Sequence, residues 1–297
     1  GAPQTIHNQV ELAGSISVGG QSLTLSDAGL TTATAVTLAA NSTLTIATGV
    51  ELDIAKSITD GAQTFSLVKA GSGTLTLGSS NSYTGTTTIN AGTLVVSALS
   101  IQTATAGTST DSLGNGGNLA ASVVIDGGVL QYVGAGGTTD RNFTIGTSGG
   151  TLTASGNGAL VMNSTAAIGG TGVRNLVLNG SSTATNQLAA QLALSTGTLT
   201  KSGPGTWGLT SATSNYTGVT SITDGVLEVT KLANGGTASS IGSSTSTAAN
   251  LVISTGATLR YVGAGDTSNR AFTIGLGGGT IASSGTGLLS IGSAAAA

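Results

Sequence analysis

The chain contains no cysteine, two prolines and a single histidine among its 297 residues. Without cysteine it can form neither disulfides nor thiolate metal sites. Charged residues make up only 6% of the sequence, against about 25% in an ordinary globular domain. The eight Lys and Arg residues are scattered singly, so no basic patch indicates binding to nucleic acid or to an anionic membrane.

Long apolar runs are also missing, since none approaches the roughly 20 residues that a transmembrane helix needs. What the chain does have is 49 glycines and 38% apolar residues. Low charge with abundant Gly, Ser and Thr is compatible with disorder. However, Val, Ile and Leu recur at regular spacing, so the chain can bury a core.

Two levels of internal repetition organise the sequence. On the longer level, residues 69–97 read KAGSGTLTLGSSNSYTGTTTINAGTLVVS and residues 201–230 read KSGPGTWGLTSATSNYTGVTSITDGVLEVT. Residues 130–160 likewise return as residues 259–289. On the shorter level, alternating triplets such as Leu-Thr-Leu at 75–77 recur along the chain. Most steps between triplets are roughly 18 to 24 residues, a spacing typical of one solenoid coil.

The triplets predict an all-β protein. Apolar residues alternate with Thr or Ser over four to six positions, which indicates strands with one buried face. Gly, Asn, Ser and Asp between the triplets are turn formers. No segment keeps an apolar period of 3.6 residues for a useful length, so we expect no long helix.

A parallel solenoid and an antiparallel sandwich or barrel are the two architectures left open by short regular strands. The period runs through the whole length without a linker, and hairpin signals such as Asn-Gly are few, which favours the solenoid. We predict a right-handed parallel β-helix of roughly 14 coils, a rod some 65 to 70 Å long. Residues 1–66 form its N-terminal coils, 67–198 the first long repeat, and 199–297 a second, shorter copy.

The stretch 69–97 resembles the autotransporter-associated β-strand repeat, also called the passenger-associated transport repeat. The usual form of that repeat is G-x-G-T-L-T-L-x-x-x-N-x-Y-T-G-x-T-x-I-x-x-G-T-L-x-V. The first copy matches it at Gly71, Gly73, Thr74, Leu75, Leu77, Asn81, Tyr83, Thr84, Gly85, Thr87, Ile89, Gly92, Thr93, Leu94 and Val96. The second copy matches it at Gly203, Gly205, Asn215, Tyr216, Thr217, Gly218, Ile222, Gly225, Leu227 and Val229. It departs at Trp207 and Gly208, where the family usually has Leu and Thr.

The resemblance covers most of residues 67–291 and implies an exported stalk or passenger segment, extracellular or on the bacterial outer surface. In autotransporters the repeat is associated with passage of the passenger across the outer membrane. We expect this chain to be either a fragment of a longer protein or a subunit exported by another route. We expect no cofactor and no membrane insertion by this segment. The expected partners are other chains or further coils at the rod ends, and a surface or glycan ligand is left open because the sequence does not identify one.

Two glycine-rich stretches match catalytic or phosphate-binding patterns by letter. Residues 146–150 satisfy G-x-S-x-G, but no helix follows, and the single imidazole is His7 near the N-terminus. Residues 203–208 satisfy G-x-G-x-x-G, but a strand follows where a phosphate site needs a helix N-terminus. We interpret both stretches as turns of the solenoid.

A β-helical enzyme that degrades polysaccharides is the enzymatic alternative. Glycoside hydrolysis usually needs two carboxylates about 5 to 10 Å apart. The candidate pairs are Glu51 with Asp53 and Asp224 with Glu228, and no cluster of basic residues accompanies either pair. The Gly-Gly-x-Gly-x-Asp nonapeptides of calcium-binding β-rolls are absent as well. We therefore predict a protein without catalytic, cofactor or metal sites.

Four further residues recur at matched positions. Arg141 and Arg270 suit either ligand contact or a strap that holds a loop to the solenoid, and we favour the strap. Tyr83 and Tyr216 are expected to anchor a loop against a coil. Two functional classes remain: a stalk or adhesin segment, and a self-assembling filament subunit joined end to end through its open strand edges.

Overall fold

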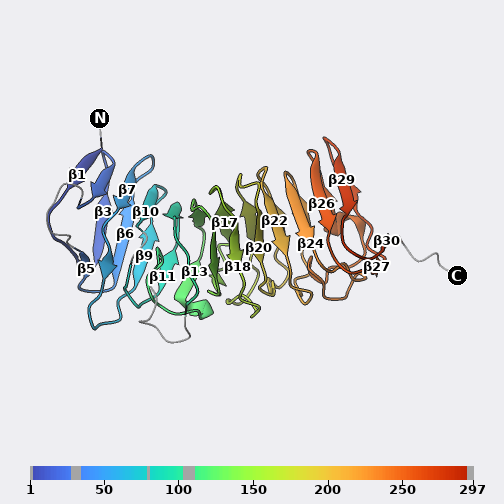
Figure 1. Ribbon diagram of the computed structural model, residues 1–297, viewed down its shortest axis with the longest axis horizontal. Coiled ribbons are helices and arrows are strands. Elements are labelled where there is room, and N and C mark those ends of the chain that lie inside the picture. The colour runs from blue at the N-terminus through green and yellow to red at the C-terminus, as the bar shows by residue number, and fades with distance from the viewer. Residues whose placement is uncertain (1–2, 28–34, 79–80, 103–110, 293–297) are drawn as a thin grey trace.

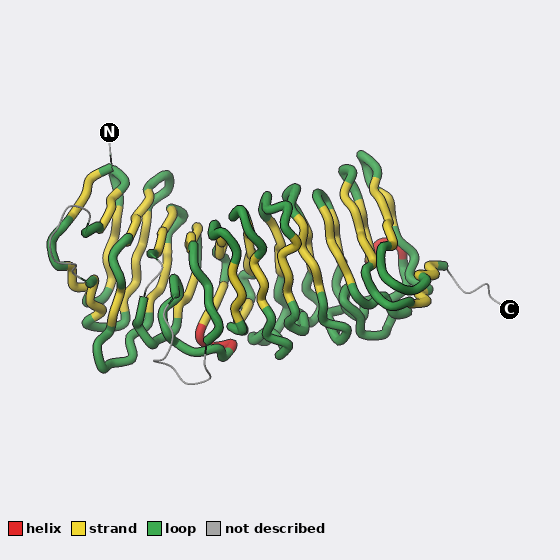
Figure 2. The backbone as a smooth tube through the Cα atoms, in the orientation of Figure 1, coloured by secondary structure: helices red, strands yellow, loops and turns green. Residues whose placement is uncertain are grey.

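The computed structural model describes residues 3–27, 35–78, 81–102 and 111–292. Within these ranges thirty short strands and two single-turn 3-10 helices, η1 (Ala120–Ser122) and η2 (Ala248–Asn250), stack into a rod (Figure 1). All the strand pairs are parallel, and loops link each strand to the next around the rod (Figure 2). The prediction of an all-β parallel β-helix is confirmed.

Three long sheets line the rod. The twelve-stranded sheet has the order β1 (Gln4–Ile6), β4 (Leu23–Leu25), β7 (Glu51–Ile54), β10 (Thr74–Leu77), β12 (Thr93–Val96), β14 (Val129–Tyr132), β17 (Gly150–Ala154), β19 (Leu176–Asn179), β21 (Leu199–Lys201), β23 (Thr220–Ile222), β25 (Leu251–Ile253) and β28 (Thr273–Ile274). The six-stranded sheet contains β3 (Ser15–Val18), β6 (Ser42–Ile46), β9 (Leu67–Ala70), β11 (Thr87–Ile89), β13 (Val123–Ile125) and β16 (Thr144–Ile145).

The seven-stranded sheet contains β15 (Gly137–Thr139), β18 (Leu160–Met162), β20 (Thr185–Leu188), β22 (Thr206–Leu209), β24 (Val226–Val229), β26 (Ala257–Tyr261) and β29 (Gly279–Ser283). Two short sheets complete the described part of the rod: β2 (Val10–Leu12), β5 (Val36–Leu38) and β8 (Ile58–Thr59) form one, and β27 (Asp266–Ser268) and β30 (Leu289–Ile291) form the other.

Coil length varies more than the sequence pattern predicts. Leu75 pairs with Leu94 in the next coil, and Leu94 pairs with Leu130 in the coil after that, so the second step consumes almost twice as much chain as the first. The expected range of roughly 18 to 24 residues per coil is therefore wrong for coils that carry a long loop. Because such loops consume residues without adding a coil, the longest sheet has twelve strands, fewer than the number of coils expected.

The core follows the alternation in the sequence. In β10, Leu75 and Leu77 point inward and are buried, while Thr74 and Thr76 point outward and remain half-buried. Full burial of one leucine side chain stabilises the fold by about 2 kcal/mol. Since each coil adds such residues on every face, a single apolar core runs from β2 to β26.

The two long repeats are rotated against each other around the rod. Strands β9 and β11 of the first copy lie in the six-stranded sheet, but their counterparts β21 and β23 lie in the twelve-stranded sheet. Likewise β10 and β12 lie in the twelve-stranded sheet, but β22 and β24 lie in the seven-stranded one. The second copy is therefore turned by one sheet, because the distance between the copies is not a whole number of coils.

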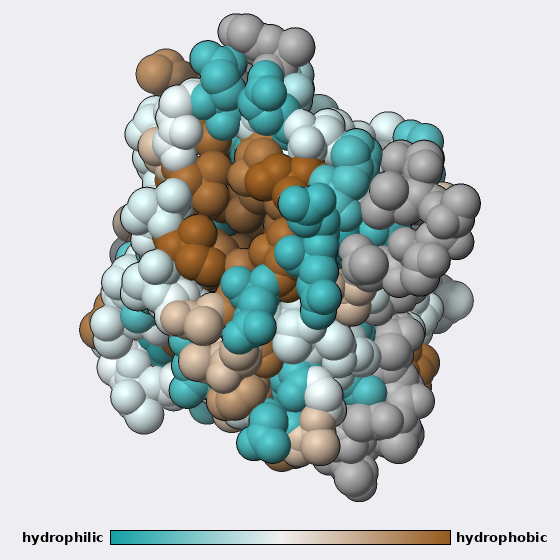
Figure 3. Space-filling view, turned by 90° about the vertical axis from the view of Figure 1, so that its left-hand side faces the viewer, coloured by the Kyte–Doolittle hydropathy of each residue, from teal (hydrophilic) through white to brown (hydrophobic). Residues whose placement is uncertain are grey.

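The N-terminal end of the rod leaves part of this core uncovered. Seen end-on, apolar side chains fill the centre of the first coils (Figure 3). Val10, Ile16, Val18 and Leu23 are partly buried there and pack against the main core. At the other end, Leu276 and Leu288 are 94% and 83% exposed. In the part of the chain that the structure describes, no helix has the length and hydropathy to span a membrane.

Candidate functional site

The G-x-S-x-G stretch is a turn between β16 and β17. Gly149 adopts a positive φ of 79°, and a strand, not a helix, follows it. The backbone N–H of Ser148 donates to Oδ1 of Asp126 at 2.8 Å. His7 lies in the N-terminal coil, 3.0 Å from the carbonyl oxygen of Ser26. Serine and histidine are thus in different coils of the rod, and they cannot act as a nucleophile and its base.

The G-x-G-x-x-G stretch is also a corner. Gly203 has a φ of 70°, and the chain then enters β22, whose four residues are all buried. The indole N–H of Trp207 donates to the carbonyl oxygen of Asn179 at 2.8 Å. Because the segment continues as a strand, it offers no helix N-terminus to a phosphate.

The two acid pairs occupy different kinds of position. Glu51 and Asp53 both face outward from β7, where Glu51 accepts a hydrogen bond from the hydroxyl of Thr76 at 2.8 Å. Partial burial, and then the neighbouring charge of Glu51, raise the pKa of Asp53. In the register of the sheet, Asp53 lies between Thr24 and Thr76, so no cationic side chain flanks it on the neighbouring strands.

Asp224 and Glu228 are not brought together as a pair. Asp224 lies in the turn before β24 and accepts the N–H of Gly225 at 2.7 Å. Glu228 lies on β24 itself and forms an ion pair with Arg260 at 2.7 Å. Among the described residues, no group of three His, Asp or Glu side chains is placed to hold a metal ion.

Burial of basic side chains is the feature that the sequence reasoning missed. Six of the eight are at most 4% exposed: Lys56, Lys69, Arg141, Arg174, Lys201 and Arg270. The ammonium of Lys69 donates to the carbonyl oxygens of Ala70, Gly71 and Ala91 at 2.9, 2.6 and 3.1 Å. The ammonium of Lys201 likewise donates to the backbone carbonyl oxygens of Ser202, Gly203 and Asp224. Each lysine therefore ties together the backbone of two successive corners.

Both of these lysine ties fall inside segments that match a known repeat. Residues 67–96 and 199–229 match the family model of the passenger-associated transport repeat. The chain contains two passenger-associated transport repeats. This repeat protein is also 44% identical over 230 residues to the adhesin BmaC autotransporter of Brucella suis biovar 1 (strain 1330). That alignment covers 75% of the chain but spans only 7% of the relative's length. No solved structure matches the chain.

The tyrosines of the two repeats are interior anchors, as expected. Tyr83 and Tyr216 are fully buried. Their hydroxyls lie 2.6 and 2.7 Å from the hydroxyls of Thr87 and Thr220, which follow them within the same coil. Burial raises the pKa of both phenols. A hydroxyl pair at this spacing satisfies both polar groups inside the core.

The two arginines fasten the long loop that follows each repeat. Arg141 donates to the carbonyl oxygens of Gly114 and Gly117, and its guanidinium forms an ion pair with Asp111 at 3.1 Å. Arg270 has the same position in the second copy, where it donates to the hydroxyl of Ser244 and to the carbonyl oxygen of Gly242. The strap interpretation is supported, but the guanidinium groups are buried under their loops instead of lying on the flank.

The buried lysines give the repeats a measurable pH dependence. Burial lowers the pKa of Lys69 and Lys201 to about 8, although the nearby Asp224 opposes the shift at Lys201. An unfolded chain keeps the ordinary lysine pKa near about 10.4. Between these values the unfolded state binds more protons than the folded state, so the free energy of unfolding should rise with pH.

Urea unfolding at intervals from about pH 7.5 to about pH 9.5 measures this rise. The range stops there because the raised pKa values of the buried tyrosines lower stability once tyrosines of the unfolded chain ionise near about pH 10. Lys69→Met and Lys201→Met should each remove part of the slope, and the double variant should remove it. If the free energy of unfolding rose with pH as steeply in the double variant as in the unaltered chain, the two lysines would not be its source.

Proposed function

We propose that the chain is a non-enzymatic structural segment of an exported, surface-displayed adhesin-like protein, in which it serves as a rigid spacer. The observation that carries this proposal is the continuous parallel sheet from β1 to β28, which runs through both transport repeats. Such a stack resists bending because each coil is hydrogen-bonded to the coils on either side. The adhesin relative supports a surface location.

The rod ends are the joining surfaces in this proposal. Apolar side chains lie open at the N-terminal end (Figure 3), and Leu276 is exposed near the other. Further coils of a longer polypeptide would bury these residues and pair the free strand edges. The relative is far longer than this chain, which favours further coils of the same polypeptide, instead of a second copy of the chain, as the neighbour at each end.

Self-assembly into filaments is the second candidate, because the same ends would suit the end of another copy. Small-angle scattering and electron microscopy of the purified chain at several concentrations distinguish the two. A rod whose length is independent of concentration supports the spacer, whereas fibres that grow with concentration support the filament. Surface labelling of intact cells that carry the parent protein tests the location, and failure to label would contradict it.

An enzymatic role would be established by a different result. Turnover of a polysaccharide that is lost in Glu51→Gln or Asp53→Asn would overturn the structural proposal. Asp126→Asn is a suitable control and should leave any such turnover unchanged. The carboxylate of Asp126 lies in a turn and accepts a hydrogen bond from the backbone N–H of Ser148.

A further inference from the structure

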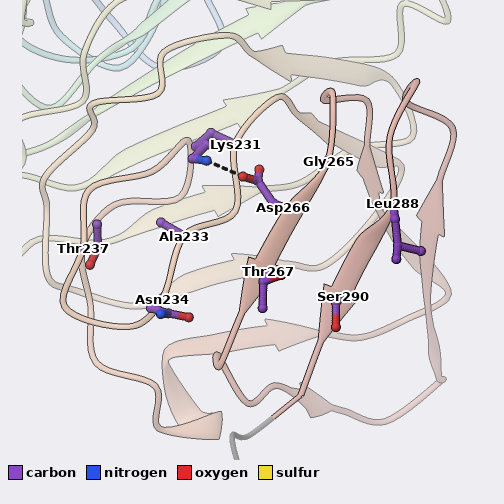
Figure 4. A pocket seen from close by; sticks show the side chains of 9 residues that line it. All are labelled: Lys231, Ala233, Asn234, Thr237, Gly265, Asp266, Thr267, Leu288 and Ser290. Carbon is purple, nitrogen blue, oxygen red and sulfur yellow. Dashed lines mark hydrogen bonds and ion pairs between the residues drawn. The ribbon is translucent and has the colours of Figure 1, made fainter.

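A broad groove lies on the outer surface of the rod near β27 and β30 (Figure 4). Its volume is about 660 Å³. Thr267 and Ser290, which are both exposed, form the floor, and the loop after β24 forms one wall with Asn234 and Thr237. Leu288 stands at the opposite edge. The size is in the range of sites that take small organic ligands, about 300 to 1,000 Å³.

The wall of this groove is held in place by hydrogen bonds and an ion pair. The carboxylate of Asp266 binds the ammonium of Lys231 and accepts the N–H of Leu232 at 2.9 Å. Burial would raise the pKa of Asp266, but these bonds outweigh it and lower the pKa. Asn234 accepts the N–H of Asn269 at 2.9 Å, and Asn269 in turn accepts that of Gly235 at 2.9 Å. The groove is therefore formed before any ligand arrives.

Several polar groups that face the groove are not used by the fold. The hydroxyls of Thr237, Thr267 and Ser290 form no hydrogen bond with another described residue, and neither does the amide nitrogen of Asn234. A hydroxyl both donates and accepts, and an amide nitrogen donates twice. Together with the exposed aliphatic side chain of Leu288, this lining suits a polar molecule that carries many hydroxyls of its own.

We propose that this groove binds a neutral oligosaccharide. Lys231 is neutralised by Asp266, so the site has no spare positive charge for an anionic sugar. The unpartnered groups named above are side-chain hydroxyls and an amide nitrogen, and such groups pair with the hydroxyls of a sugar. The proposal goes beyond the spacer function, which stands or falls independently of it.

The first repeat supplies a natural comparison. At the positions of Lys231, Asp266 and Ser290 it has Ala98, Gly137 and Val161, so the ion pair and one hydroxyl are missing. Thr138 is the counterpart of Thr267. If the polar lining determines binding, the second repeat binds sugar and the first does not.

Two-dimensional NMR of the labelled chain, titrated with cellobiose, maltose, lactose and chitobiose, tests the proposal. At least one of these should shift the amides of residues 231–237 and 265–267 with a millimolar Kd, as expected for a small open site. Thr267→Val and Ser290→Ala should each weaken binding about three- to tenfold through loss of one hydrogen bond. Thr138→Val is the matched control and should change nothing.

Three results would overturn the proposal. These are no shift with any of the four sugars, equal weakening by Thr138→Val, and tighter binding of an anionic disaccharide or of an extended peptide. Because the variants alter exposed hydroxyls, they leave the fold intact, and scattering of each variant checks that the rod is unchanged. A failed titration with an intact rod would count against the groove alone.

Discussion

Replacing Asp111 by serine should lower the free energy of unfolding by about 3 kcal/mol, because it leaves the guanidinium of Arg141 buried without its counter-charge. The two side chains are 1% and 2% exposed, and two oxygen–nitrogen pairs join them at 3.1 and 3.3 Å. The same carboxylate also accepts the backbone N–H groups of Ser100 and Leu113, so both parts of the loop lose their fastening.

Urea unfolding gives the overall loss for this variant, and hydrogen exchange at residues 111–118 shows whether the loop opens first. Asp126→Ser is the matched control, since the carboxylate of Asp126 accepts one backbone N–H, that of Ser148. This substitution should lower the free energy of unfolding by about 1 kcal/mol. Equal losses in the two variants would show that the ion pair with Arg141 contributes nothing.

Alanine in place of Gly92 should destabilise the first repeat by about 3 kcal/mol, since two costs add. The φ of Gly92 is 65°, a conformation that residues with a Cβ adopt at a penalty. The new Cβ would also overlap the carbonyl oxygen of Gly73 and lie 2.8 Å from Nζ of Lys69. The methyl group would thus push the lysine tie out of its corner.

Gly49→Ala separates these two costs. Gly49 has a similar φ of 73°, but nothing lies within 4 Å of the position of its Cβ. The control should therefore lose only about 1 kcal/mol, the cost of the backbone conformation alone. If Gly92→Ala lowers the free energy of unfolding no more than Gly49→Ala does, the backbone at Gly73 can move aside for the new methyl group. Thermal or urea unfolding measures both losses.

Sequence periodicity predicted the strands well because each one has its own apolar alternation. The pattern of Leu75, Leu77 and Leu94 specifies an inward face whatever the rest of the coil does. Coil length was predicted less well, because a loop between two strands changes the residue count and leaves their pairing unaltered. The long coil from Leu94 to Leu130 keeps the same register as the shorter ones.

The polar interior was harder to predict. Lysine is almost never fully buried, so a general rule assigns Lys69 to the surface. Its position in β9, on the same face as the buried Leu67, was the signal that it faces inward. The partner of Arg141 had no such signal, because Asp111 lies far before it in the chain and the second repeat has Ser239 at the matching bridge.

The rotation between the two repeats determines how a longer chain of such units would meet its surroundings. Three long sheets line the rod, and the strands of the second repeat lie one sheet further round than their counterparts in the first. If every further unit turned by the same step, corresponding loops would follow a helical path around the rod axis. A loop would then return to the same side of the rod only in every third unit. A cell or matrix lying along one side of such a rod would thus contact different parts of successive units, and every side of the rod would present the same set of loops.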